Sequence, residues 1–208
     1  LDDRYGSDLY RRGYRVYTTL DIEMQRRAVE AMEQGWANIE AQPAFRAPRY
    51  EDVINDRVDG RGRAESPYIQ GMFIAMEAGT GEIRALIGGR DFNDSKFNRA
   101  TQARRQPGSV FKPFVYGAAI SSRIPASHII YDAPLMVDQP DGSFWAPRNF
   151  GETFNGPTTL REALRRSINV VTVKLAQEVG IETVVQFARR AGIETPVPPV
   201  LASSIGAG

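Results

Sequence analysis

Cysteine is absent from this sequence of 208 residues, and histidine occurs only once. The absence of cysteine excludes disulfide bonds, zinc sites with thiolate ligands and cysteine nucleophiles. The single histidine, His128, excludes a metal site built from several histidines, and we interpret this residue as structural or surface-exposed. We therefore expect neither disulfide bonds nor histidine-bound metal in this protein.

The sequence also lacks an excess of charge of either sign, with 26 basic and 25 acidic residues and a formal net charge of +1. The basic surplus typical of nucleic-acid-binding proteins is missing, so nucleic acid is not expected as a partner. No apolar run reaches the roughly 18 residues of a membrane-spanning helix, and no signal segment opens the chain. Any membrane anchor or export signal is expected to lie outside this chain.

The N-terminal half combines periodic segments with two polar stretches. Residues 1–13 are expected to be a linker, and residues 41–67, rich in Pro, Gly, Arg and Asp, an irregular insertion. Residues 14–20 alternate like a short strand. The remaining expected elements of this half are a helix over 21–40 with Thr19 or Asp21 as its N-cap, and an antiparallel hairpin over 68–90.

The C-terminal half is dominated by expected helices. Residues 110–120 predict a buried helix, in which Pro113 is tolerable only in the first turn. Thr159 and Glu162 have the spacing of a capping box, so a helix should begin near Leu160. The remaining expected elements are a weaker hairpin over 135–145 and helices over 170–179 and 182–191, which end at Gly180 and Gly192.

Ser109 and Lys112, within the segment RRQPGSVFKPFVY, are the first candidate catalytic pair. Side chains three residues apart share one face of a helix, so the two groups can form a hydrogen bond. A serine nucleophile needs a base, and an amine can serve if its surroundings lower its pKa by about three units. The alternative is a helix that simply begins with a small polar residue. Lys112 is, however, one of only three lysines among 26 basic residues, and it lies on an apolar segment.

Ser167 and Asn169 form a second candidate pair, 58 residues after Ser109 in the segment RRSINVV. They fall between two expected helices, so both side chains could project into a cleft. A Ser-x-Asn sequence at such a junction is more often a helix cap. Its combination with Ser109 and Lys112 favours a catalytic role instead.

The two motifs together resemble those of the penicillin-recognising serine enzymes. The longer phrases TTLDIEMQRRA, MEAGTGEIRALIGGR and FNGPTTLREALRRSINVVTVKLAQEVG resemble the transpeptidase domain of class A, bifunctional penicillin-binding proteins. The resemblance covers residues 14–208, apart from 41–67, and makes them a partial penicillin-binding transpeptidase domain. It implies an α/β fold of the α+β type, the β-lactamase/transpeptidase-like fold, in which a helical cluster packs on an antiparallel sheet.

By this resemblance, Ser109 is the nucleophile that becomes acylated, and Lys112 is the base that activates it. Ser167 would relay a proton to the leaving amine, and Asn169 would bind the substrate's peptide amide or hold Lys112 in place. The implied activity is a serine D,D-transpeptidase that crosslinks peptidoglycan stem peptides ending in D-Ala-D-Ala, is acylated by β-lactam antibiotics and needs no cofactor. The alternatives are a D,D-carboxypeptidase or β-lactamase of the same fold, and a non-catalytic β-lactam-binding sensor domain.

A further motif of this family, Lys-Thr/Ser-Gly on an edge strand, does not occur in the sequence. We expect it downstream, which would make the chain a piece of a longer protein with an incomplete sheet and weak or no activity alone. The resemblance also implies a membrane anchor upstream, on the extracytoplasmic face of the bacterial cytoplasmic membrane, and a cell-wall synthesis complex as a further partner.

Overall fold

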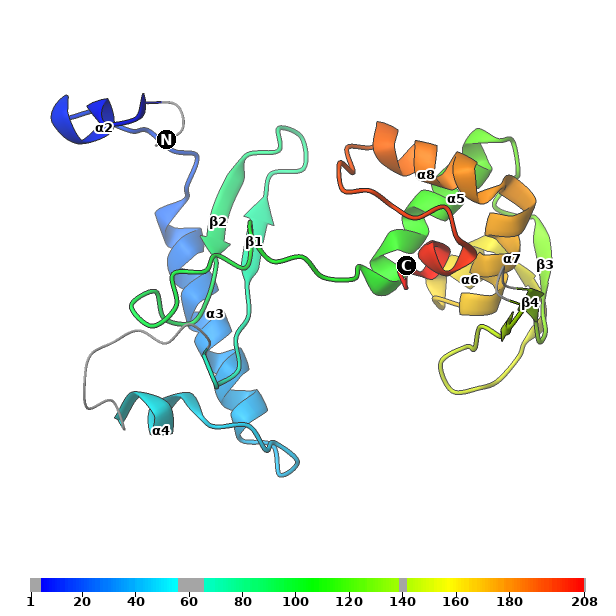
Figure 1. The fold of residues 1–208 in the computed structure, drawn as a ribbon, viewed down its shortest axis with the longest axis horizontal. Coiled ribbons are helices and arrows are strands. Elements are labelled where there is room, and N and C mark those ends of the chain that lie inside the picture. Colours follow the sequence, from blue (N-terminus) through cyan, green and yellow to red (C-terminus); the bar gives the residue numbers. More distant parts are fainter. Residues whose placement is uncertain (1–4, 56–65, 139–141, 208) are drawn as a thin grey trace. The chain divides into compact units, whose positions relative to one another are not determined.

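The computed structural model describes residues 5–55, 66–138 and 142–207, and the chain divides into two compact units, Leu1–Arg104 and Arg105–Gly208 (Figure 1). Each unit is described separately. Among the described residues, no helix is both long enough and apolar enough to span a membrane.

The first unit is built from one long helix packed on a two-stranded antiparallel sheet. Asp21, one of the two caps expected from the sequence, accepts the N–H of Met24 at 2.9 Å and so begins the helix. Ala28, Trp36 and Ala85 are buried between helix and sheet. The hairpin predicted over 68–90 is confirmed, although its strands are shorter. The elements are α3 (Ile22–Glu40), β1 (Phe73–Met76) and β2 (Ile83–Ile87).

Side chains cover the outer edge of β2. The Thr19 hydroxyl donates to the carbonyl of Ile83 at 2.8 Å. The Gln25 amide accepts the N–H of Leu86 at 2.8 Å and donates to its carbonyl at 3.1 Å. These bonds occupy positions that a neighbouring strand would otherwise fill. The strand predicted over 14–20 is therefore wrong, because this segment reaches β2 through single hydrogen bonds rather than through a ladder.

Short helices occur within the two stretches predicted to be polar linker and irregular insertion. The stretch 1–13 contains α2 (Asp8–Arg11), and the stretch 41–67 contains α4 (Tyr50–Asn55). The parts of these predictions that lie outside the described residues are 1–4 and 56–65.

A largely buried ion pair between Glu40 and Arg90 anchors α4 to the end of α3. The Arg90 guanidinium donates to both carboxylate oxygens of Glu40, at 2.5 and 3.1 Å, and the two side chains are only 12% and 10% exposed. This pair lowers the pKa of the Glu40 carboxyl. Tyr50, the first residue of α4, donates its backbone N–H to Glu40 at 3.1 Å, and its ring centroid lies 4.5 Å from the Arg90 guanidinium carbon.

We expect Arg90→Lys to lower the free energy of unfolding by about 1–3 kcal/mol, because an ammonium group cannot bind both oxygens and stack on the ring together. Denaturant unfolding of the purified variant measures this change. Arg27→Lys is the matched control, since Arg27 pairs with Glu23 at 73% and 56% exposure, and it should stay within about 0.5 kcal/mol. Equal losses in both variants would contradict the anchoring role.

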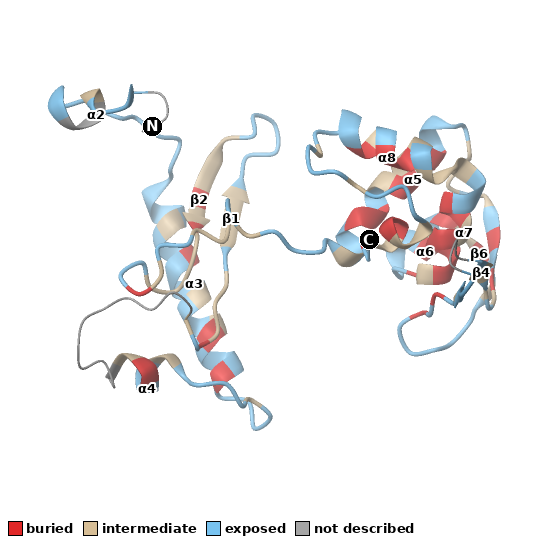
Figure 2. Ribbon diagram, in the orientation of Figure 1, coloured by how far each residue is buried: buried red, intermediate tan, exposed pale blue. Residues whose placement is uncertain are grey.

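The second unit is a cluster of helices in which α5 and α7 pack against one another (Figure 1). Val115 and Ala119 of α5, Val171 and Leu175 of α7 and Val184 of α8 are fully buried. Figure 2 shows the buried segments gathered on these helices. The elements are η1 (Gly108–Phe111), α5 (Lys112–Ser121), α6 (Leu160–Arg165), α7 (Asn169–Val179), α8 (Ile181–Arg190) and η2 (Leu201–Ile205).

Two short antiparallel pairs of strands belong to this unit. Thr159 ends one of the strands and caps α6 by accepting the N–H of Glu162 at 3.3 Å, as its spacing predicted. The hairpin predicted over 135–145 is also present, with its residues 139–141 outside the described part. The pairs are β3 (Ile129–Asp132) with β6 (Gly156–Thr159), and β4 (Val137–Asp138) with β5 (Phe144–Trp145).

Candidate active site

Lys112 is the centre of the candidate site and the most deeply buried cationic side chain in the described residues, with 1% of its surface exposed. It begins α5, and Pro113 follows in the first turn, as predicted. Its Nζ atom donates to the backbone carbonyl of Ser167 at 2.6 Å, to the Ser167 hydroxyl at 2.9 Å and to Oδ1 of Asn169 at 2.7 Å. The fold thus brings together three of the four residues predicted for the site.

The junction between α6 and α7 has an unusual backbone that presents these oxygens. Ser167 has a φ of +55°, in the left-handed region that residues other than glycine rarely occupy. Ile168 is extended and buried, and α7 begins at Asn169. A single residue held at positive φ costs on the order of 1 kcal/mol, so the surrounding packing must enforce it. The turn lets one residue, Ser167, offer both its carbonyl and its hydroxyl to the amine.

The orientation of the Asn169 amide follows from its second contact. Its Nδ2 donates to the backbone carbonyl of Arg148 at 2.8 Å. A carbonyl can only accept, so the amide nitrogen faces Arg148 and the amide oxygen faces Lys112. The sequence reasoning missed Arg148, because a backbone carbonyl leaves no signature in the choice of side chain.

Burial lowers the pKa of the Lys112 amine from 10.5 to about 8. The three oxygens around Nζ belong to a carbonyl, a hydroxyl and an amide, none of which carries a negative charge to counteract this shift. At a pKa of about 8 the neutral amine is the minority form at pH 7, on the order of one molecule in ten, and its share increases as the pH rises. Such an amine has a lone pair that can accept a proton.

Ser109 lies one turn before Lys112, in η1, and the Lys112 N–H donates to its backbone carbonyl. Its side chain is exposed, and its hydroxyl forms no hydrogen bond within the described residues. The hydrogen bond that the spacing of Ser109 and Lys112 permits is therefore not formed in this structure, because Nζ is directed at Ser167 and Asn169. As the second residue of η1, Ser109 has a backbone N–H without an acceptor inside its helix.

A close approach of two glycines fixes the backbone just before Ser109. Gly108 has a φ of +56° and donates its N–H to the carbonyl of Gly206 at 3.2 Å. Gly206, at a φ of +70°, ends η2, and a Cβ atom on it would lie 2.1 Å from the carbonyl oxygen of Gly108. No side chain fits between the two backbones, so η2 holds η1 directly.

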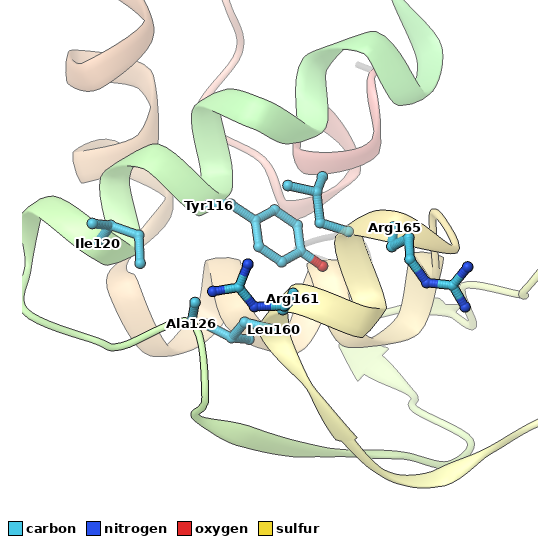
Figure 3. Close-up of a pocket in the computed structure, with 7 residues that line it drawn as sticks. Tyr116, Ile120, Ala126, Leu160, Arg161 and Arg165 are labelled. Atoms are coloured by element: carbon cyan, nitrogen blue, oxygen red, sulfur yellow. The ribbon is translucent and has the colours of Figure 1, made fainter.

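A pocket of about 320 Å³ lies elsewhere on α5, over the side that faces α6 (Figure 3). Its lining is mostly apolar but includes two arginines. The hydroxyl of Tyr116, one of the lining residues, lies 3.1 Å from the hydroxyl of Thr172. The pocket includes none of the four predicted site residues. Its lining consists of Tyr116, Ile120, Ala126, Leu160, Arg161, Leu164 and Arg165.

Comparison with known proteins identifies the family. Residues 71–206 match the protein family described as the penicillin-binding protein transpeptidase domain. The chain belongs to this family. Penicillin-binding protein 1A of Neisseria lactamica is 44% identical over 162 residues, which are 75% of this chain and 20% of the relative. Penicillin-binding protein 1A of Neisseria meningitidis serogroup A is 30% identical over 290 residues, which cover 100% of this chain and 36% of the relative.

Among solved structures, penicillin-binding protein 1A from Haemophilus influenzae matches with a TM-score of 0.65 and 31% identity, over 69% of this chain and 22% of that chain. The fold is therefore the β-lactamase/transpeptidase fold of penicillin-binding proteins, as the resemblance implied. The chain spans 20%, 36% and 22% of the lengths of these three relatives.

We expect Gly206→Ala to destabilise this unit by several kcal/mol, because a methyl group would overlap the Gly108 carbonyl in a backbone already unfavourable for alanine. Gly192→Ala is the matched control, since Gly192 has a φ of +99° but open space around it; it should cost only about 1 kcal/mol. Thermal and denaturant unfolding measure both changes. A loss in Gly206→Ala no larger than in Gly192→Ala would show that the two backbones can separate freely.

Proposed function

We propose that the chain is the serine D,D-transpeptidase domain of a penicillin-binding protein that crosslinks peptidoglycan stem peptides ending in D-Ala-D-Ala. The observation that carries this proposal is the buried Lys112 amine, held by Ser167 and Asn169 one turn after an exposed serine. A lysine so placed within this family is suited to act as a base rather than as a surface charge.

In the first half of the reaction, Ser109 is acylated. The Ser109 hydroxyl turns toward Lys112, gives its proton to the Nζ lone pair and attacks the carbonyl carbon between the two D-alanines. Catalytic hydrogen bonds are often unformed before the substrate binds, which is consistent with the exposed hydroxyl of Ser109. The Ser109 N–H at the start of its helix supports the developing oxyanion. The peptide C–N bond then breaks, and the amine of the terminal D-alanine leaves with the proton that Lys112 held.

Ser167 is proposed to carry that proton, because its hydroxyl lies 2.9 Å from Nζ and can both donate and accept. In the second half, the amine of another stem peptide attacks the ester carbonyl carbon, and the C–O bond to Ser109 breaks. The proton that the amine loses returns to the Ser109 oxygen through Lys112. A β-lactam would acylate Ser109 by the same first half. Of the two roles expected for Asn169, holding Lys112 is favoured, since both ends of its amide are already engaged.

Peptidoglycan lies outside the cytoplasmic membrane, so the proposal places the domain on the extracytoplasmic face, anchored by a segment outside this chain, and in contact with a cell-wall synthesis complex. A D,D-carboxypeptidase or a β-lactamase would use the same acylation but pass the acyl group to water. A non-catalytic β-lactam-binding domain would not turn over stem peptides.

Ser109→Ala in the full-length protein tests the function itself. We expect labelling by a fluorescent penicillin to be abolished and the formation of crosslinked stem peptides to fall by on the order of a thousandfold or more, because the nucleophile is gone. Ser122→Ala, at an exposed position after α5, is the matched control and should keep both activities. Wild-type labelling of the Ser109→Ala protein would refute the proposal. If the unmodified protein releases hydrolysed stem peptides without crosslinked dimers, its activity is that of a carboxypeptidase.

The pH dependence of acylation tests the role of Lys112. Because burial lowers the pKa of the amine to about 8, the neutral form that accepts the proton increases as pH rises through 8. The second-order rate of penicillin acylation should therefore increase with pH, with a midpoint near that value. Arginine stays charged over this range, so Lys112→Arg should lose acylation at every pH, whereas Lys96→Arg, at an exposed position, should keep the profile. Near-normal acylation by Lys112→Arg would remove Lys112 from the role of base.

A further inference from the structure

Asp132 and Asn149, which no sequence motif singled out, begin a chain of hydrogen bonds that ends at the first turn of α7. Asp132 is the last residue of β3 and is 1% exposed. One of its carboxylate oxygens accepts the side-chain amide of Asn149 at 2.8 Å. The other accepts the backbone N–H and the side-chain amide of Asn155, at 2.9 and 2.6 Å. Asp132 is thus a buried carboxylate in which each oxygen binds one asparagine.

The side chain of Asn149 has one orientation that satisfies its contacts. Its Nδ2 donates to Asp132 and to the backbone carbonyl of Thr153 at 3.0 Å, and both of these groups only accept. Its Oδ1 therefore points the other way and accepts the N–H of Val170 at 3.0 Å. That N–H belongs to the first turn of α7 and has no acceptor inside the helix.

The backbone carbonyl of Arg148, next to Asn149, binds Asn169, the residue of α7 just before Val170. The carbonyl of Arg148 accepts the amide of Asn169, whose oxygen faces the Lys112 amine at 2.7 Å. Residues 148 and 149 therefore bind two consecutive residues of α7, one through a carbonyl and one through a side chain. If Asn149 moves, the Arg148 carbonyl and the start of α7 move with it.

Lys174 ties the same helix and strand together one turn further on. From α7, its ammonium group donates to the carbonyls of Tyr131 and Ala133 at 2.7 and 3.1 Å, on either side of Asp132. α7 is thereby connected to the region of Asp132 at two points along its length. Two points fix the direction of the helix as well as the position of its first turn.

We propose that Asp132 and Asn149 are positioning residues of the acyl-transfer site, which set the start of α7 so that Asn169 holds the Lys112 amine. This inference rests on the proposed function, because the group that is positioned is the base of that reaction. Neither residue touches the reacting atoms in this arrangement. Their effect passes through Asn169.

Asn149→Ala and Asn155→Ala in the full-length protein separate positioning from stability. Both variants remove one side-chain hydrogen bond to Asp132, but only Asn149 also reaches α7. The acylation step of the reaction with a fluorescent penicillin should slow by on the order of tenfold to a hundredfold in Asn149→Ala, with little change in the Kd of the initial complex. Asn155→Ala should stay within a few fold of the wild-type rate. Thermal unfolding of both variants is measured alongside, because Asn149→Ala removes three side-chain hydrogen bonds and Asn155→Ala removes one.

A rescue experiment uses the same pair of residues and decides the matter even where Asn149→Ala fails to fold. Asn149→Asp keeps one oxygen for the N–H of Val170, but its second oxygen replaces the amide nitrogen and faces the Asp132 carboxylate, so the two groups repel one another and acylation should slow. Adding Asp132→Asn restores an N–H donor between the two positions and should recover the rate severalfold.

Three results would overturn the positioning role: equal losses in Asn149→Ala and Asn155→Ala, an unchanged rate in Asn149→Ala, or a double variant no faster than Asn149→Asp alone. If labelling is abolished in Ser109→Ala and any of these results is obtained, only the positioning role fails. Wild-type labelling in Ser109→Ala would instead overturn the proposed function together with this inference.

Discussion

The burial of one amine, that of Lys112, is the constraint around which the second unit is organised. An amine removed from water must bind other polar groups, and here they are three uncharged oxygens. The fall in its pKa from 10.5 to about 8 corresponds to roughly 3 kcal/mol of destabilisation of the charged form. A carboxylate in the same place would have removed that shift. With neutral partners the pKa stays low, as the proposed role of base requires.

The packing of α5 against α7 offsets this cost. Fully buried residues on both sides, among them Val115, Ala119 and Val171, hold the two helices in contact. Burial of each such side chain contributes about 1–3 kcal/mol, so a few of them exceed the penalty for the amine and for the strained turn at Ser167. The apolar core and the polar site therefore depend on one another, because the helices that form the core carry the groups of the site.

The residues of the candidate site could be predicted from the sequence, but the residues and backbone geometry that support them could not. Lys112 was predicted because it is a rare lysine on an apolar segment, three residues after a serine. Ser167 and Asn169 were predicted because their motif together with the first resembles that of the penicillin-recognising serine enzymes, and the structure brings these three residues together. The positive φ of Ser167 and the contact with the Arg148 carbonyl could not be predicted, because both are properties of the backbone. Asp132 and Asn149 were missed for another reason: they lie 17 residues apart and meet only once β3 and the loop before β6 are folded.

The helices and the hairpins were predicted well where a cap or an apolar period marks them. The N-caps of α3 and α6 are Asp21 and Thr159, and the C-cap of α7 is Gly180, as the residue types at these positions predicted. The prediction of a strand over 14–20 was wrong for a physical reason. Alternating apolar and polar residues are found both in a segment that lies along the edge of a sheet and in one that joins the sheet as a strand. Whether such a segment forms a ladder depends on what else occupies the edge, and Gln25 from α3 already occupies part of it.

The arrangement around Lys112 also explains how the site can serve both protonation states without moving heavy atoms. The Ser167 carbonyl and the Asn169 amide oxygen can only accept, so they take two N–H groups in either state. The third position on Nζ faces the Ser167 hydroxyl. It holds an N–H that this hydroxyl accepts when the amine is charged, and a lone pair to which the hydroxyl can donate when the amine is neutral. Within this set of contacts the two states differ in the direction of that hydroxyl hydrogen, and turning it away from Nζ frees the lone pair for the Ser109 hydroxyl in the proposed reaction. Because Lys112, Ser167 and Asn169 can keep their positions, only the Ser109 side chain has to turn for the proposed proton transfer, which limits the reorganisation around the amine.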